Sequence, residues 1–198
     1  MRKRKNAEFR KPEILESLYN IIIKEGIEGA SMAKIAKKIN IHTSLIFHYF
    51  QNKENMLIEL AKFIEEKYDP PYVRKKLKKI KDPKQRFEEF LNSLFSEEDL
   101  KSVDHSVYYA FYYLTYRNEK IRECYTHMFK KHRDFIVREL DLYMREGVIK
   151  KIDLEIAADF IVSLFEGLGF IYDFLADDKP HEVYGKFAKD VIKQYLTT

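Results

Sequence analysis

Apolar residues recur at every third or fourth position along most of this chain, and this spacing predicts helices rather than strands. Glycine and proline are scarce, with 6 and 5 among 198 residues, and the alternation typical of half-buried strands is absent. We therefore predict an all-α fold of about nine helices. No apolar run approaches the roughly 18 residues that a membrane-spanning helix needs, so we expect no membrane partner.

Helix start and stop residues divide the chain into two predicted domains, residues 1–68 and a larger helical domain, residues 69–198. Pro12 is expected at the start of the first helix, and Asn40 at the end of the second. Ser31, Asn52 and Asp82 suit the N-caps of three further helices. The predicted helices cover residues 11–25, 32–39, 43–50, 53–68, 72–80, a segment that begins after Asp82, 103–117, 119–146, 153–176 and 181–196.

Residues 32–51 have the spacing of a helix-turn-helix motif, whose second helix enters the major groove of DNA. Ile46 and Phe50 are predicted to pack inward. The outer face of this second helix is then short and rich in hydrogen-bonding groups, and it consists of Thr43, Ser44, Leu45 and His48. Such side chains can contact base edges, and Tyr49 and Lys53 are placed to contact phosphates. The alternative is an ordinary helical hairpin whose polar residues are only solvated.

The distribution of charge favours a polyanion partner for the front of the chain. Residues 1–81 carry 19 Lys and Arg against 10 Asp and Glu, whereas residues 82–198 carry 17 against 22. The basic tail, residues 2–5, is expected to add non-specific affinity or to enter a minor groove. Basic residues that only solvate helix surfaces would give the same count, so the charge alone does not decide.

Longer sequence motifs add a family resemblance. Gly26 is followed by Ser31-Met32-Ala33-Lys34-Ile35-Ala36, by Ile41 in the turn, and by the ending FHYFQNKENML of residues 47–57. Residues 10–57 therefore resemble the DNA-binding region of the TetR family of transcriptional regulators. Ser44, Phe47 and His42 replace residue types that are common in the family, which leaves the DNA sequence recognised open.

The resemblance implies a TetR-type helix-turn-helix domain over residues 1–68 and a duplex DNA operator as its partner. By position, it implies base contacts by Thr43, Ser44, Leu45 and His48, and phosphate contacts by Ser31, Tyr49 and Lys53. It also implies a C-terminal domain, residues 69–198, that binds an effector and forms a dimer.

The last two predicted helices, about 153–176 and 181–196, are suited to build a homodimer. Residues 156–175 are apolar nearly all round, so this helix must be covered on more than one side. Gly167 and Gly169 are easier to explain if another helix approaches there, because glycine costs about 1 kcal/mol in a helix relative to alanine. In the family, these two helices pair with their symmetry mates. Both helices could instead serve only the core of one chain.

Aromatic residues crowd the middle of the chain, where residues 105–116 run HSVYYAFYYLTY. Aromatic walls with a few polar groups are typical of small-molecule pockets, although an aromatic stripe is more often plain core. We predict that an apolar or aromatic effector is bordered by Tyr108, Tyr112, Tyr116, Phe129 and His132.

Several classes of chemistry find no support in the sequence. We see no nucleophile elbow, Gly-rich phosphate loop or catalytic triad spacing, so we predict no enzyme, no catalytic residue and no cofactor. Cys124, His127 and His132 match no zinc motif, so we predict no metal. The lone cysteine is typical of a reducing compartment, and the charged N-terminus differs from a signal peptide, so we expect a cytoplasmic protein.

Together these features predict a ligand-responsive transcriptional regulator, in the first instance a repressor, that binds a palindromic operator as a dimer. A constitutive DNA-binding or architectural protein with a purely dimerising rear domain is the first alternative. A helical enzyme or carrier that uses the aromatic segment is the second.

Overall fold

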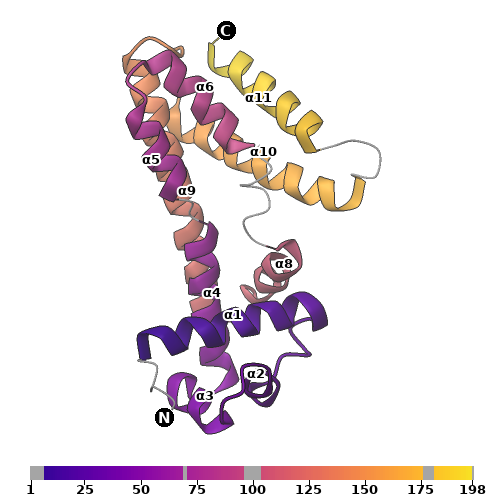
Figure 1. Ribbon diagram of the computed structural model, residues 1–198. Helices are drawn as coiled ribbons and strands as arrows, with labels where there is room; N and C mark the ends of the chain where they lie inside the picture. Colours follow the sequence, from indigo (N-terminus) through magenta and orange to yellow (C-terminus); the bar gives the residue numbers. More distant parts are fainter. Residues whose placement is uncertain (1–6, 69–70, 96–103, 176–180, 198) are drawn as a thin grey trace. The chain divides into compact units, whose positions relative to one another are not determined.

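The structure is a computed structural model that describes residues 7–68, 71–95, 104–175 and 181–197. Within these residues the chain forms ten α-helices and no strand, which confirms the all-α prediction (Figure 1). The helices are α1 (Ala7–Glu25), α2 (Met32–Lys38), α3 (Thr43–Phe50), α4 (Lys53–Tyr68), α5 (Pro71–Lys79), α6 (Pro83–Leu94), α8 (His105–Leu114), α9 (Glu119–Arg145), α10 (Leu154–Leu175) and α11 (His181–Thr197). The basic tail, residues 2–5, lies outside the described residues.

The predicted N-caps begin their helices through short side-chain hydrogen bonds. Ser31 Oγ accepts from the backbone N–H of Lys34 at 3.2 Å, and Asp82 Oδ1 accepts from that of Gln85 at 2.9 Å. Each bond satisfies a backbone donor that has no partner within its helix. Asn40 has a φ of 53°, the left-handed conformation predicted for the residue that ends α2.

The predicted start of the first helix was wrong. Helix α1 begins at Ala7, and Pro12 lies inside it rather than at its first position. Pro12 lies near the start of α1 and its ring is exposed, so it removes only one intrahelical hydrogen bond, close to the helix end. The cost of this proline therefore stays small enough for the helix to continue towards its N-terminus.

The described chain divides into two compact units. Unit 1 comprises Met1–Tyr68 and Val103–His127, and unit 2 comprises Asp69–Ser102 and Met128–Thr198, so α9 contributes to both. Residues 103–127 were expected in the C-terminal domain, but the structure groups them with the first four helices. One of the contacts responsible joins α1 to the start of α8, where the Asp104 N–H donates to the Tyr19 hydroxyl at 2.7 Å.

The core of unit 1 is built on one face of α1. Ile14, Leu18 and Ile22 are fully buried along this face at helical spacing. Helix α1 packs against α2, α4 and α8, and α3 packs between α2 and α4. The helix-turn-helix segment is therefore held from behind by an apolar layer rather than by its own short helices.

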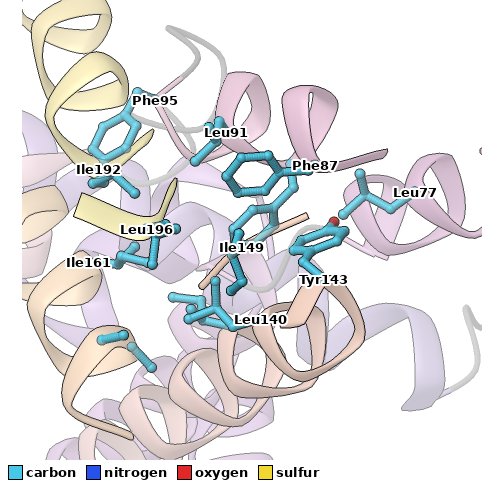
Figure 2. Close-up of a cluster of buried hydrophobic side chains, with 14 of the residues drawn as sticks. Leu77, Phe87, Leu91, Phe95, Leu140, Tyr143, Ile149, Ile161, Ile192 and Leu196 are labelled. Carbon is cyan, nitrogen blue, oxygen red and sulfur yellow. The ribbon is translucent and has the colours of Figure 1, made fainter. Parts of the chain in front are cut away.

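The core of unit 2 is an apolar cluster contributed by α5, α6, α9, α10 and α11 (Figure 2). The rings of Phe87 and Tyr143 meet edge to face within it, with centroids 5.2 Å apart. Gly185 lets α11 approach α6 closely, because a Cβ there would stand 2.9 Å from the carbonyl oxygen of Phe95. None of the described helices combines the length and the apolar character that a membrane span requires.

Candidate nucleic-acid interface

Helices α2 and α3 form the predicted helix-turn-helix. The turn between them is closed by a hydrogen bond of 2.9 Å from the Ile41 N–H to the carbonyl of Ala36. Asn40 supplies the left-handed backbone step that redirects the chain. Helix α3 covers Thr43–Phe50, the range predicted from the sequence.

The inner face of α3 fixes how the helix is turned. Ile46 and Phe50 are buried, as predicted, and they belong to the same core as Ile35 and Ala36 of α2. Residues four apart lie on one side of a helix, so burial of this pair points the opposite side outward. Rotation of α3 about its axis would expose two large apolar side chains.

The outer face of α3 carries the residues predicted to contact bases. Ser44 and His48 are exposed, and Thr43 and Leu45 are partly exposed. Ser44 and His48 are four residues apart, so they share one side of the helix. Their hydroxyl and imidazole groups can donate to and accept from base edges in a major groove.

His42 is the N-cap of α3, a role that the sequence analysis left unassigned. Its Nδ1 lies 3.4 Å from the backbone nitrogen of Ser44, from which it accepts, and 2.7 Å from Ser44 Oγ. One imidazole thus satisfies a free backbone donor and holds the serine hydroxyl at the start of the helix. The signal for this role was the imidazole nitrogen at a position where a small polar cap is usual.

Ser31, Tyr49 and Lys53 are the residues predicted to contact phosphates. Ser31 and Lys53 already form hydrogen bonds within the chain, but each keeps N–H or O–H groups that can still donate. Lys53 Nζ donates to the carbonyl of Ile27 at 3.2 Å, which uses one of the three ammonium N–H groups. Ser31 Oγ accepts from the Lys34 N–H, so the hydroxyl proton can still be donated. Tyr49 is partly exposed and packs edge to face on the His48 ring at 5.5 Å.

Phe47 is a surface residue that the sequence analysis did not include among the DNA contacts. Its ring is 50% exposed, although it lies between the buried Ile46 and the exposed His48. An exposed large aromatic ring on a short polar face has no role in the core of the chain. In the sequence, Phe47 stood out only as a replacement of a residue type common in the family, and its position three residues after Ser44 was the signal for surface exposure.

The five residues predicted to border an effector divide between the two units. In unit 1, Tyr108 is buried, whereas Tyr112 and Tyr116 are exposed and their hydroxyl oxygens are 3.1 Å apart. In unit 2, Phe129 and His132 are partly buried, and the His132 and Phe165 rings meet edge to face with centroids 6.3 Å apart. Tyr108 packs on Tyr125, whose hydroxyl donates to the Tyr108 carbonyl at 2.8 Å.

The residues considered for a metal have other neighbours. His127 Nδ1 lies 2.6 Å from Glu65 Oε1, which joins α9 to α4 within unit 1. Burial raises the pKa of the Cys124 thiol, so this cysteine stays protonated and is a poor metal ligand or nucleophile. Over the described ranges, no three His, Cys, Asp or Glu side chains are grouped in a way that could hold a metal ion.

The surface of α10 and α11 in unit 2 carries a second notable feature, a set of exposed large apolar side chains. Its members are Ile156, Phe160, Phe170, Ile171, Phe174, Leu175, Val183, Phe187 and Tyr195. Gly167 lies among them on α10, and a Cβ built there would meet nothing within 4 Å in this chain. The close helix approach expected at Gly167 is therefore not made by the residues that the structure describes.

The fold and this outward-facing α3 define a helix-turn-helix protein, and comparisons with known proteins identify its family. A family model described as "Tetracyclin repressor-like, C-terminal domain" matches residues 82–195. A second, described as "Bacterial regulatory proteins, tetR family", matches residues 14–60. The chain therefore belongs to the TetR family of transcriptional regulators, which confirms the resemblance and places it among regulators rather than enzymes.

Individual relatives agree with this assignment. The HTH-type transcriptional regulator PksA of Bacillus subtilis is 28% identical over 179 residues, which cover 85% of this chain and 80% of PksA. The HTH-type transcriptional regulator BetI of Burkholderia cenocepacia is 22% identical over 105 residues, about half of each chain.

Solved structures share the fold over nearly the whole chain. A transcriptional regulator from Pseudomonas aeruginosa superposes with a TM-score of 0.82 at 21% identity, covering 97% of this chain and 92% of that one. A regulator from Saccharomonospora viridis, solved in complex with choline, has a TM-score of 0.82 at 18% identity, covering 96% and 99%. FadR from Bacillus subtilis, solved with stearoyl-CoA, has a TM-score of 0.71 at 18% identity, covering 91% and 96%.

Proposed function

We propose that this protein is a dimeric, ligand-responsive transcriptional repressor that acts in the cytoplasm on a palindromic operator. The observation that carries the proposal is the division of α3 into two faces. Ile46 and Phe50 are buried in the body of unit 1, while Ser44, Phe47 and His48 face outward. A helix fixed from behind, with hydrogen-bonding groups in front, suits insertion into a major groove.

In the proposed complex, the outer face of α3 supplies sequence preference and its surroundings supply anchorage. Thr43, Ser44 and His48 would hydrogen-bond to base edges, and Leu45 would contact a thymine methyl group. Ser31, Tyr49 and Lys53 would hold phosphates on either side of the groove, which fixes register without selecting sequence.

Dimerisation is proposed through the exposed apolar side chains of α10 and α11. One helix-turn-helix offers little contact area, and two recognition helices must be held about one helical turn of DNA apart, roughly 34–36 Å. Many exposed apolar side chains on two helices that pack together are typical of an obligate interface. Gly167, with open space in front of it, would let a helix of the second copy approach.

An effector is proposed to control the spacing of the two recognition helices. Related folds have been solved with choline and with stearoyl-CoA, so the architecture accommodates small ligands of different chemistry. For this chain we propose an apolar or aromatic compound that contacts aromatic residues of unit 2, with Phe129 and His132 among them. By linkage, an effector that weakens DNA binding must itself bind less tightly to the DNA-bound protein, by the same factor.

The proposal is tested by selecting bound fragments from a pool of random duplex DNA. We expect a palindrome with half-site centres 10 to 11 base pairs apart, or a multiple of that spacing. The selected duplex is then titrated with the protein in the presence of candidate effectors, and the affinity is measured by fluorescence anisotropy. Recovery of unrelated sequences would refute the operator, and an operator affinity that no compound changes would refute the switch.

The burial of Tyr108 favours one alternative, a DNA-binding protein that responds to no effector. Its ring packs on Tyr125, with centroids 5.5 Å apart, as expected of a core residue rather than a cavity wall. A constitutive DNA-binding protein would need no cavity there. Calorimetric titration of the free protein with the compounds used above separates the two, since a constitutive protein would bind none of them.

A further inference from the structure

Helix α5 and the residues that follow it carry a concentration of positive charge outside the helix-turn-helix. Residues 74–84 contain seven Lys and Arg and one acidic residue, Asp82. The two segments that form unit 2, residues 69–102 and 128–198, contain 20 Lys and Arg and 20 Asp and Glu in all. The unit thus has no net charge, and seven of its 20 positive side chains lie on this one short stretch.

The core of unit 2 determines which side of α5 presents this charge. Val73 and Leu77 are buried in the apolar cluster and hold one side of the helix against it. Lys75, Lys78 and Lys79 are exposed, and at 100° per residue they project from the opposite side. Lys81 and Lys84 continue the exposed basic surface into the start of α6.

Few of these charges are neutralised within the protein. Lys76 pairs with Glu89, and the Arg74 guanidinium lies over the ring of Phe135 at 5.1 Å from its centroid. By contrast, no other residue in the described part of the chain forms an ion pair with Lys75, Lys78, Lys79, Lys81 or Lys84. Like charges on neighbouring positions of a helix repel one another, so an anionic partner would stabilise this surface.

We propose that this lysine surface, formed by Lys75, Lys78, Lys79, Lys81 and Lys84, is a second DNA contact that binds duplex phosphates without sequence preference. The inference rests on the proposed function, because a DNA-bound regulator is surrounded by phosphate at high local concentration. Lysine ammonium groups act as mobile point charges, which suits a phosphate backbone rather than base recognition. A membrane surface fits less well, because the apolar side of α5 is occupied by the core and cannot insert among lipids.

The proposal has a quantitative consequence for binding in salt. Each phosphate that a lysine neutralises releases condensed counterions and adds about 0.9 to the slope of log affinity against log salt concentration. Loss of three lysine contacts should therefore reduce the slope by about two to three. Sequence preference should not change, because that property resides in α3.

The test compares two triple variants of the full-length protein. K75Q/K78Q/K79Q removes the centre of the lysine surface, and K130Q/K151Q/K186Q removes three exposed lysines elsewhere in unit 2. Glutamine has a helix propensity close to that of lysine, and a thermal melt followed by circular dichroism verifies that both variants fold. Binding to a random-sequence duplex of about 40 base pairs, which leaves DNA on both sides of any one site, is measured between 0.05 and 0.3 M salt.

We expect the first variant to bind the random duplex about tenfold more weakly than wild type at 0.1 M salt, with the reduced slope. The control variant should retain most of the wild-type slope. Equal slopes for the two variants would overturn the proposal. So would loss of binding to phosphatidylserine vesicles by the first variant while its DNA binding stays at the control level, since the partner would then be a membrane.

The outcome is separable from that of the proposed function. If wild type shows no operator preference and the first variant still loses random-duplex binding, the operator is refuted and the lysine surface stands. If operator preference is intact and the two triple variants behave alike, only the lysine surface is refuted.

Discussion

The guanidinium of Arg86 donates two hydrogen bonds to the carboxylate of Glu139, from Nε at 2.9 Å and from Nη2 at 2.6 Å. The Tyr143 hydroxyl donates a third to the same carboxylate, at 2.8 Å. Glu139 is buried, and the pair joins α6 to α9 inside unit 2. A largely buried charge pair joined by two hydrogen bonds resists the loss of either partner.

Glu139→Gln should therefore destabilise the protein strongly, by about 3 kcal/mol, because it leaves the Arg86 charge without its counter-ion. The free energy of unfolding is measured by urea denaturation at neutral pH. Asp141→Asn is the matched control, since Asp141 forms an exposed pair with Arg145 one turn apart and should cost about 0.5 kcal/mol. Equal losses for the two variants would contradict the role given to the buried pair.

Tyr143 gives unit 2 a sensitivity to alkaline pH. Burial raises the pKa of its hydroxyl above the usual 10.0, and the negative charge of Glu139 raises it further. Above pH 10 the unfolded chain loses this proton while the folded chain keeps it, so stability falls as pH rises, by up to about 1.4 kcal/mol per pH unit. Burial also raises the pKa of the Tyr19 hydroxyl, so Tyr19 accounts for part of the remaining loss of stability above pH 10.

Tyr143→Phe should therefore cost about 1 kcal/mol at pH 7, where the hydrogen bond to Glu139 is lost, and should flatten the decline above pH 10. Urea midpoints measured between pH 8 and 11 check both effects. An alkaline decline as steep as that of wild type would show that Tyr143 ionises in the folded protein.

Replacement of His48 and replacement of Lys53 should change DNA binding in different ways. His48→Ala removes a group proposed to contact a base, so it should lower the preference for the selected operator over random DNA, by about 1 kcal/mol or more. Lys53→Ala should weaken binding to both DNAs alike and reduce the salt slope by about one. Anisotropy titrations against both duplexes at several salt concentrations distinguish the two patterns, and the same pattern for both variants would contradict the assignment.

Phe47 is expected to contribute to operator affinity through its half-exposed ring. Covering that ring with a thymine methyl or a sugar would contribute about 1 kcal/mol, so Phe47→Ala should weaken operator binding about fivefold. Stability should change little, because half of the Phe47 side chain is already exposed to solvent. A thermal melt and an operator titration of the same sample check the two statements, and undiminished operator affinity would exclude Phe47 from the interface.

Sequence patterns predicted those features that depend on neighbouring residues. The caps at Ser31 and Asp82, the left-handed Asn40 and the limits of α3 all arise from contacts within a few positions. Burial of Ile46 and Phe50 followed from helical spacing alone.

Features that depend on distant contacts were not accessible in the same way. The grouping of residues 103–127 with unit 1 depends on pairs such as Tyr19 with Asp104, which are 85 positions apart. The aromatic residues 105–116 show the same limit, because their spacing cannot distinguish the buried Tyr108 from the exposed Tyr116. Contacts of α8 with α1 and α9 determine which tyrosine is buried, and these contacts cannot be predicted from the local sequence.

The apolar surface of α10 and α11 gives the most direct test of the dimer. Phe187 is 68% exposed, and burying such a ring against a second copy would contribute about 2 kcal/mol per protomer. Phe187→Glu would place two charges in the interface, so we expect a monomer at micromolar concentration by sedimentation velocity, with operator affinity reduced at least tenfold. Lys186→Glu, at the neighbouring exposed position, introduces the same side chain outside the apolar set and should leave the dimer intact. A dimer that survives Phe187→Glu would place the interface on another surface, and a monomeric wild type would remove the basis for a palindromic operator.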